Sequence, residues 1–499
     1  MKVLSRLSGL AAKLLRFLRP SGPPPAPSAA RRLPTGEAER KRTRSDQTKE
    51  PAPQETAREA PSPGPRRPPR AVARNLIVGV DFGTSTTKVA WHDTTEDRFE
   101  VFRWGPEQAG IESALLPSLI AVRDQQIWFG HQAAELSNPD LRLPWIKICV
   151  LCERNQGICR RCSHSPERGT VALGSHTRVS ARALAALFLS HVIGSVERGL
   201  LSRYSGENVT IQWNVGCPMD HIDSLKAHAL YEAMVHLAWE LRSGVPNPTG
   251  LDAACAAEAV LLDLQVPEDS ERVIRVRPET HAGVMAFLQS PHAEERTYVI
   301  VDVGAGTTEI SMFLHGGDRS QRGDPFPFFS NYLNDHSFPV GGGDVDRELA
   351  EIWAVDIETA RQRKERGEDL GVTLKTVDRI LQGYRYVCGK VRAENRLPPR
   401  QCTYDLFAFG GGSRLKAVQR ILRSDLQYFP LERRRFEQVR PPKNLARFDG
   451  LDSNFDLLAV ACGLASTMFW DFRPPAETGP MEPPAPPRQG PDRDELYPK

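Results

Sequence analysis

Two segments of this chain, 221 positions apart, carry almost the same residues in the same order: VGVDFGTSTTKV at 78–89 and VIVDVGAGTTEI at 299–310. Each begins with an apolar run typical of a strand, turns at a glycine and resumes with β-branched residues. That pattern predicts a β-hairpin with a tight tip of small residues. Because the two copies align without a gap, we expect a duplicated structure with one such hairpin in each half.

The two hairpin tips have the composition of an anion-binding site. Glycine lets backbone N–H groups approach an anion closely, threonine and serine add hydroxyl donors, and an aspartate at a strand end can hold a hydrated magnesium ion. The aspartates here are Asp81 and Asp302. A single tip of this kind often only reverses the chain, whereas two copies in register predict a cleft that grips a polyphosphate from both sides.

The two hairpins resemble the first and second phosphate motifs of the nucleotide-binding domain of the seventy-kilodalton heat-shock chaperones (DnaK type). That family lies in the superfamily that also contains actin and sugar kinases. Further segments follow in the order of the family, and the likeness covers nearly all of residues 75–471. They are LPSLIA at 116–121, VGCP at 215–218, PETHAG at 278–283, VGGGDVD at 340–346, FGGGSRL at 409–415 and AVACGLA at 459–465.

The resemblance implies an α/β, two-lobed actin-like ATPase fold built from duplicated ribonuclease H-like domains. Lobe I would span residues 75–291 together with 452–471, with a cysteine-rich insertion at 147–166, and lobe II would span 292–451. Outside the lobes, composition predicts a basic amphipathic helix at 1–20, a disordered linker rich in proline and arginine at 21–74, and a disordered proline-rich tail at 472–499.

The resemblance also implies roles for individual residues in binding ATP or ADP with Mg²⁺. Asp81 and Asp302 would hold the magnesium through water, Lys147 would be the catalytic lysine, and Glu279 would orient the attacking water. Phosphate contacts would come from Gly83, Thr84, Ser85, Thr86, Gly304, Ala305, Gly306 and Thr307. The remaining nucleotide contacts would come from Gly342, Gly343, Arg392, Gly410, Gly411, Gly412, Ser413 and Arg414.

Two of these positions have a second interpretation, and a third belongs to a poorly matched motif. Without the resemblance, Lys147 reads as an ordinary surface lysine, and Glu279 reads as a helix-start carboxylate favoured by the helix dipole. The charged adenine clamp of the chaperones is poorly matched, because Gly389 stands where an acidic residue is expected and Arg392 is the only candidate that we identify beside it.

The chain continues for about thirty residues past the nucleotide-binding likeness, and these are proline-rich rather than a β-sandwich and lid. We therefore expect a slow, magnesium-dependent ATPase that acts as a nucleotide-controlled regulator or adaptor for an unidentified protein partner. Slow turnover is expected because no in-chain arginine finger is recognisable. A small-molecule kinase of sugar type and an actin-like scaffold are the alternatives.

Charge is distributed unevenly along the chain. Residues 1–74 hold 17 Lys and Arg against 6 Asp and Glu, although the whole chain has a formal net charge of only +3, so the remainder is acidic. An acidic body argues against nucleic acid as the main ligand. The longest uncharged apolar stretch, 183–196, is too short to span a membrane, which favours a cytoplasmic protein. The basic helix at 1–20 is compatible with peripheral contact to a membrane, docking on a partner, an organellar transit peptide, or a solvated tail.

The chain contains 9 cysteines and no recognisable secretory signal, which favours a reducing compartment. Four of them form two Cys-x-x-Cys pairs, Cys149 with Cys152 and Cys159 with Cys162. That spacing predicts a tetrahedral metal site, most simply structural zinc; an iron–sulfur cluster and buried thiols are the alternatives. The others, expected to be small core residues, are Cys217, Cys255, Cys388, Cys402 and Cys462.

The zinc hypothesis predicts that the purified chain contains one zinc ion. Titration of its thiols should show that four of them become reactive only after a chelator is added, because metal-bound thiolates are protected. A metal content of zero for both zinc and iron, with all four thiols reacting freely from the start, would contradict it.

Overall fold

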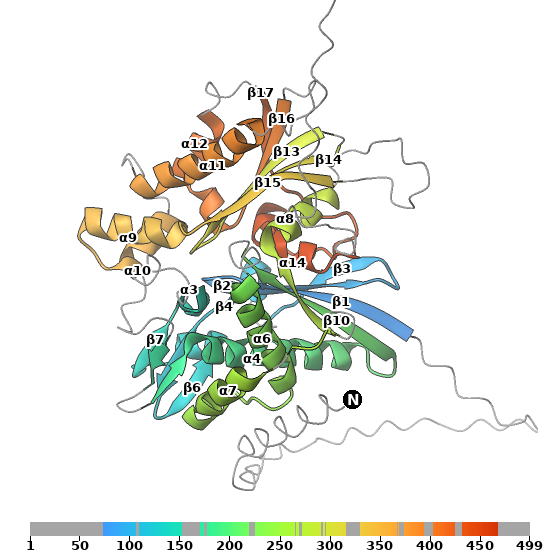
Figure 1. Cartoon of the computed structure of the whole chain (residues 1–499), viewed down its shortest axis with the longest axis vertical. Helices are drawn as coiled ribbons and strands as arrows, with labels where there is room; N and C mark the ends of the chain where they lie inside the picture. Colours follow the sequence, from blue (N-terminus) through green and yellow to red (C-terminus); the bar gives the residue numbers. More distant parts are fainter. Residues whose placement is uncertain are drawn as a thin grey trace, which may run out of the picture.

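The computed structural model describes residues 73–105, 109–151, 170–173, 177–218, 225–264, 266–268, 272–290, 293–294, 296–315, 330–366, 368, 374–393, 403–424 and 432–467. The predictions for residues 1–20, 21–72 and 472–499 lie outside these ranges, as do Cys152, Cys159, Cys162 and Cys402. The last two residues of the predicted disordered linker, Ala73 and Arg74, are strand residues, so the boundary at 74 is wrong: pairing with a neighbouring strand orders them. Within the described residues the protein is a mixed α/β structure, as expected (Figure 1).

The first motif begins the larger of the two main sheets. Its strands lie in the order β12-β10-β1-β2-β3, and the short strand β4 also pairs with β2. The β1–β2 and β2–β3 pairs are antiparallel, while β10 is parallel to both β1 and β12. The bounds are β1 Ala73–Phe82, β2 Thr86–Asp93, β3 Arg98–Val101, β4 Leu116–Pro117, β10 Asn208–Cys217 and β12 Ile274–Pro278.

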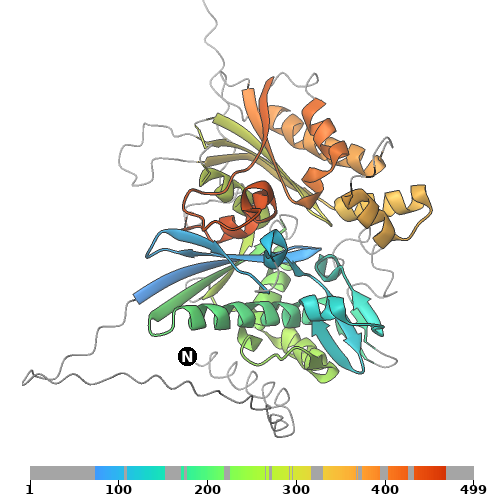
Figure 2. The same cartoon turned by 180° about the vertical axis from the view of Figure 1, so that it is seen from behind.

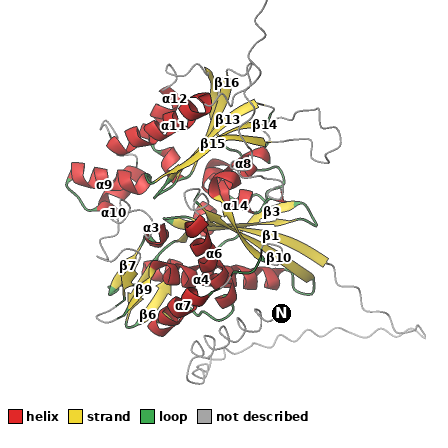
Figure 3. Cartoon of the chain, viewed as in Figure 1, coloured by secondary structure: helices red, strands yellow, loops and turns green. Residues whose placement is uncertain are grey.

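The second motif begins a sheet of the same topology, in the order β17-β16-β13-β14-β15. Again the first three strands form an antiparallel meander, and two parallel strands follow beside the first. The bounds are β13 Arg296–Val303, β14 Thr308–His315, β15 Ser330–Phe338, β16 Thr403–Phe409 and β17 Glu432–Gln438. Both predicted hairpins are therefore confirmed, and the repeated sequence marks a repeated strand arrangement (Figure 3).

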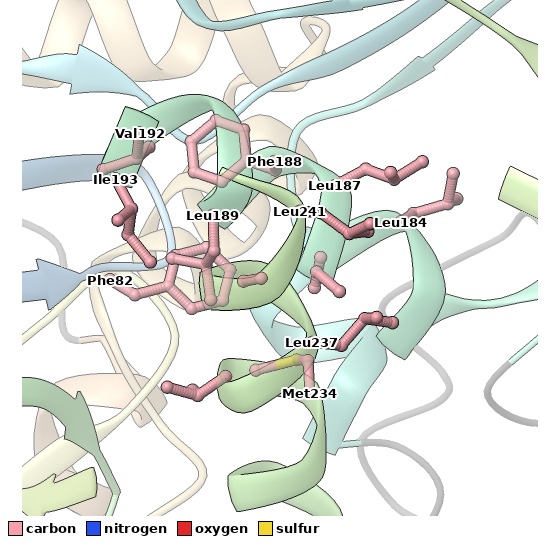
Figure 4. Close-up of a cluster of buried hydrophobic side chains, with 14 of the residues drawn as sticks. Phe82, Leu184, Leu187, Phe188, Leu189, Val192, Ile193, Met234, Leu237 and Leu241 are labelled. Carbon is pink, nitrogen blue, oxygen red and sulfur yellow. The ribbon is translucent and has the colours of Figure 1, made fainter. Parts of the chain in front are cut away.

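Two helices cover the outer face of the first sheet, α4 Ala181–Arg203 and α6 Leu225–Leu241, and a third, α7 Leu251–Asp263, packs against both of them. Figure 2 shows α4 running along this sheet, and Figure 4 shows its apolar side chains packed against α6 and Phe82. The Ser180 side chain accepts from the Ala183 N–H at 3.1 Å and caps α4. Among the described helices, α4 alone is long and apolar enough to cross a membrane, and 67% of that apolar window is buried inside the protein.

A second helical layer lies between the two main sheets. It contains α8 Glu279–Leu288 and α14 Ala459–Leu464, preceded by the short helix α13 Leu451–Asn454 and a 3₁₀ turn at Phe455–Leu457. Alternate residues of β13 divide between two cores: Tyr298 and Ile300 pack toward α8 and α14, while Val299 and Val301 pack toward the outer helices. The period-two pattern of the strand thus places a helical layer on each face.

The outer layer of the second sheet consists of α9 Gly342–Trp353, α10 Ile357–Glu365, α11 Lys375–Ala393 and α12 Lys416–Ser424. A small antiparallel sheet at the edge of the first half is formed by β5 Ile120–Arg123, β6 Gln126–Phe129, β7 Leu141–Leu143 and β11 Thr249–Gly250. Short elements complete the description: β8 Thr170–Ala172, β9 Arg178–Ser180, α2 Gly130–Glu135, α3 Ile146–Leu151 and 3₁₀ turns at Gly110–Ala114 and Gly411–Arg414.

Three of the expected core cysteines, Cys217, Cys388 and Cys462, are buried. The prediction for Cys255 is wrong, because this residue is exposed. Helix α7 buries the face that carries Ala253, Ala254, Ala257 and Leu261, and position 255 lies away from that face.

Helices α8 and α14 cross at Gly463. A Cβ atom there would lie 1.8 Å from the Ala282 carbonyl oxygen, so the two backbones are in direct contact. A neighbouring contact is similar, since a Cβ at Gly79 of β1 would lie 2.3 Å from the Ala461 carbonyl oxygen. Glycine at these two positions therefore lets α14 approach α8 and β1 to backbone contact.

Substitution of Gly463 by alanine should lower the free energy of unfolding by about 3 kcal/mol, because the added methyl group overpacks a backbone contact. Gly389→Ala is the matched control: it lies in α11, where a Cβ would meet nothing within 4 Å, and should stabilise the protein by about 0.5–1 kcal/mol. Denaturant unfolding measures both, and equal effects of the two substitutions would contradict the packing argument.

Candidate functional site

A cavity of about 720 Å³ lies between the tips of the two hairpins. That volume falls within the range typical of small-molecule sites. Most of the residues implied by the sequence line it, and they come from both halves of the chain. They are Asp81, Gly83, Thr84, Ser85, Thr86, Lys147, Glu279, Asp302, Gly304, Ala305, Thr307, Gly342, Gly343, Gly410, Gly411, Gly412 and Arg414.

Three implied residues stand apart from this set. Gly306 is not among the cavity-lining residues. A Cβ there would lie 2.3 Å from Cδ1 of Ile148 and 2.8 Å from Oγ1 of Thr84, so glycine at this position lets the two hairpin tips pack closely. Ser413 is buried behind the cavity wall, where its hydroxyl donates to the Gly410 carbonyl at 2.8 Å. Arg392 belongs to α11, but its side chain lies outside what the structure describes.

Backbone contacts fix the shape of the hairpin tips. The Gly83 N–H donates to the Asp81 carbonyl at 3.0 Å, and the Gly304 N–H donates to the Thr307 carbonyl at 2.9 Å. The second tip also receives the start of α9, because the N–H groups of Gly342 and Gly343 each donate, at 2.8 Å, to the carbonyls of Gly304 and Ala305. The positive end of the α9 dipole is thereby fixed beside the cavity.

The glycine-rich loop after β16 packs directly on the end of β13. Gly410 adopts φ +72°, and a Cβ there would lie 2.3 Å from the Asp302 carboxylate oxygen Oδ1. A Cβ at Gly412 would lie 2.5 Å from Cγ1 of Val303. Glycine is therefore needed at both positions. The loop and Asp302 follow the adjacent strands β16 and β13, and both line the same cavity.

Arg414, at the end of this loop, is held in place by the segment that precedes α14. Its Nε donates to Oδ2 of Asp456 at 2.7 Å, and its Nη1 donates to Oδ1 of Asn454 at 2.7 Å. The Asp456 side chain is buried. Arg414 lines the cavity, and these bonds fix the position of its guanidinium there.

Two carboxylates mark the equivalent ends of β1 and β13. Asp81 accepts from Lys88 Nζ at 2.9 Å, across the hairpin pair in which these residues face each other. Burial, with a smaller contribution from the nearby carboxylates of Asp81 and Glu279, raises the pKa of Asp302 to about 7. A divalent cation placed between these groups would relieve the repulsion that holds the proton on Asp302.

Lys147 and Glu279 form a buried ion pair. Nζ of Lys147 lies 2.5 Å from Oε1 of Glu279, and the two side chains are 3% and 8% exposed. The surface-lysine interpretation is therefore wrong. Burial by itself would lower the pKa of Lys147, but the carboxylates of Glu279 and Asp81 overcome it and raise this pKa. Burial raises the pKa of Glu279, against the opposing effect of Lys147. Glu279 is also the first residue of α8, as the helix-start interpretation expected.

Nine charged residues of the cavity wall were not assigned to the site from the sequence: Lys88, Glu112, Glu309, Asp346, Arg361, Lys364, Glu365, Lys416 and Asp456. Lys88 and Glu309 follow their motif aspartates by seven positions and face them across each hairpin, so counting residues around the predicted tip would have identified both. Arg361, Lys364 and Glu365 come from α10, whose sequence carries no motif. Only the tertiary arrangement brings that helix to the cavity.

No group of three or more histidine, cysteine, aspartate or glutamate side chains within the described ranges is arranged to bind a metal ion directly. Magnesium held through water needs no such group. Cys149 is buried in α3, and because the other three cysteines of the cluster lie outside the described residues, the zinc hypothesis stays a prediction.

Comparison with known proteins adds no family to this picture. No protein-family model matches the chain, and no curated protein matches it either.

The raised pKa of Asp302 predicts a pH-dependent stability. Between its ordinary pKa of 3.8 and about 7, the folded protein keeps a proton that the unfolded chain releases, so this group makes folding less favourable as pH rises through that interval. Asp302→Asn removes the effect and should raise the melting temperature more at pH 8 than at pH 5. Asp449→Asn, at an exposed aspartate outside the cavity, should give no such difference.

Proposed function

We propose that the chain binds ATP or ADP with Mg²⁺ and hydrolyses ATP slowly, as a nucleotide-controlled regulator or adaptor. The single observation that carries this proposal is that both hairpin tips and the glycine-rich loop line one cavity. Each of these three segments resembles a nucleotide-contacting motif, and they lie more than 100 positions apart in the sequence. A common ligand explains why three segments this far apart in the sequence meet at one cavity.

The matching strand orders of the two main sheets favour the finer fold assignment. A meander of three strands followed by two parallel strands occurs twice, with a motif aspartate at the end of the first strand each time. We therefore assign the two halves to the lobes of an actin-like ATPase with duplicated ribonuclease H-like domains. The cleft between such lobes is where this fold class would hold its nucleotide.

In this proposal the donors at Gly83–Thr86 and Gly304–Thr307 hold the phosphates, and Asp81 and Asp302 hold the magnesium waters. Four carboxylates face this part of the cavity, Asp81, Glu279, Asp302 and Glu309, against two lysines, Lys88 and Lys147. A polyphosphate entering alone would be repelled, so the chemistry of the wall requires a cation to accompany it. When bound, Mg²⁺ neutralises charge on the phosphates as the terminal phosphoryl group leaves.

Hydrolysis is expected to be slow because Arg361, which lines the cavity, is already engaged. Nη1 of Arg361 lies 3.1 Å from Oε2 of Glu358, and Nε lies 3.4 Å from Oδ2 of Asp346. A guanidinium bound to two carboxylates is a poor donor to a developing negative charge. The Lys147–Glu279 pair is better placed: its lysine can contact the phosphates and its carboxylate can orient water.

Isothermal titration of the full chain with ATP, ADP and GTP, with and without Mg²⁺, tests the assignment. We expect ATP and ADP to bind with magnesium, GTP to bind more weakly, and Asp302→Asn to abolish the magnesium dependence. No binding of any nucleotide at millimolar concentration would overturn the proposal. Hydrolysis that depends on an added sugar would indicate a kinase instead, and ATP-dependent sedimentation would indicate a scaffold.

Lys147→Met should lower the rate of ATP hydrolysis about 100-fold, because it removes a buried charge that opposes the phosphates. Because that substitution leaves Glu279 buried without its partner, the double variant Lys147→Met/Glu279→Gln should recover stability but not activity. Lys443→Met, at an exposed lysine outside the cavity, is the control. Hydrolysis by Lys147→Met at the rate of the control would show that this lysine has no part in the reaction.

A further inference from the structure

The short helix α3 and the residue before it contact both sides of the cavity. The helix belongs to the first half of the protein, where it packs against α4. Ile148 fills the space that a side chain at Gly306 would need, and Gly306 is in the tip of the second half. In Figure 1, α3 faces α9 and α10 across the gap between the halves.

The closest contact across this gap is made by Trp145. A Cβ at Gly343 would lie 2.3 Å from Cη2 and 2.7 Å from Cζ3 of the indole ring, so the ring fits against the first turn of α9 where no side chain stands. Both residues line the cavity. The aromatic ring from one half thus occupies a notch in the other half, at the wall of the cavity.

Arg361 of α10 covers the same ring. Its guanidinium carbon lies 5.9 Å from the centre of the Trp145 ring, within the range of a cation–π interaction. Asp346 of α9 and Glu358 of α10 hold the guanidinium in this position. The partly exposed Trp145 ring therefore contacts the first turn of α9 and lies within reach of a fixed cation from α10.

We propose that Trp145 and Arg361 form a latch that closes the mouth of the cavity and slows the exit of its ligand. By the proposed function, on which this inference rests, that ligand is an adenine nucleotide. The latch spans the two halves, so the ring must leave its notch before they can separate. Because Trp145 stands two residues before Lys147, opening the latch also pulls on the helix that carries the buried ion pair.

The chain supplies a matched control for this contact. Trp353 and Arg363 form a second tryptophan–arginine pair, 4.3 Å from guanidinium carbon to ring centre, on the same two helices α9 and α10. That pair lies entirely within the second half, and neither residue lines the cavity. Its removal should weaken the packing of α9 on α10 without opening the contact between the halves.

Release of ADP that carries a fluorescent N-methylanthraniloyl group is measured by stopped flow, with magnesium and excess unlabelled ADP as the chase. We expect Trp145→Ala to speed release about tenfold and Arg361→Gln about threefold, since a partly buried cation–π contact and the ring packing are both lost. Trp145→Phe keeps an aromatic ring and should have a smaller effect than Trp145→Ala. Trp353→Phe and Arg363→Gln should leave the release rate unchanged.

The double variant separates a latch from a simple ligand contact. If the two residues act together, Trp145→Ala/Arg361→Gln releases nucleotide no faster than Trp145→Ala alone. Effects that multiply, or a release rate unchanged by Trp145→Ala, would overturn the latch while leaving nucleotide binding intact.

If no nucleotide binds and the proposed function fails, hydrogen exchange of the nucleotide-free chain still tests the latch. Loss of a latch through Trp145→Ala should raise exchange both in α3 and in the first turn of α9, which lie in different halves. A rise confined to α3 would overturn the latch, because the ring would then stabilise only its own helix.

Discussion

Electrostatic repulsion within one small volume constrains the site more than any other interaction. Asp81, Asp302, Glu279 and Glu309 all line the cavity, and they come from both sheets and from α8. The ammonium groups of Lys147 and Lys88 offset part of this charge through ion pairs with Glu279 and Asp81. Burial, together with the carboxylates of Asp81 and Glu279, raises the pKa of Asp302 to about 7, so a proton on this group relieves part of the remaining charge. A site in this condition favours ligands that bring positive charge with them, and under the proposed function a magnesium-bound polyphosphate would meet that requirement better than a free anion.

The duplicated topology explains how these charges come together. Each sheet ends its first strand with an aspartate, and the central layer of α8 and α14 brings the two strand ends to opposite walls of one cavity. The buried apolar residues form three clusters, one on the outer face of each sheet and one between the sheets. Each half thus has a core of its own, and the site lies where neither core extends. Polar and charged side chains can therefore gather there without disturbing the packing of either half.

Local sequence was enough to predict the hairpins, because glycine, threonine and β-branched residues encode a tip and its strands without reference to the rest of the chain. The burial of Cys255 was predicted wrongly because one apolar residue does not show which face of a helix is covered. The contribution of α10 could not be predicted at all: Arg361 and Lys364 read as ordinary charges of an exposed helix, and only the antiparallel return of α10 along α9 brings them to the cavity. Clusters of charge assembled by tertiary contacts have no signature in the order of residues.

The crossing of α8 and α14 has a mechanical consequence. Where Gly463 meets the Ala282 carbonyl, the helices touch through their backbones. Atoms packed this closely leave no slack, so neither helix can slide along the other without a collision. The crossing therefore sets the distance between the two sheets, and with it the width of the cavity that their strand ends line.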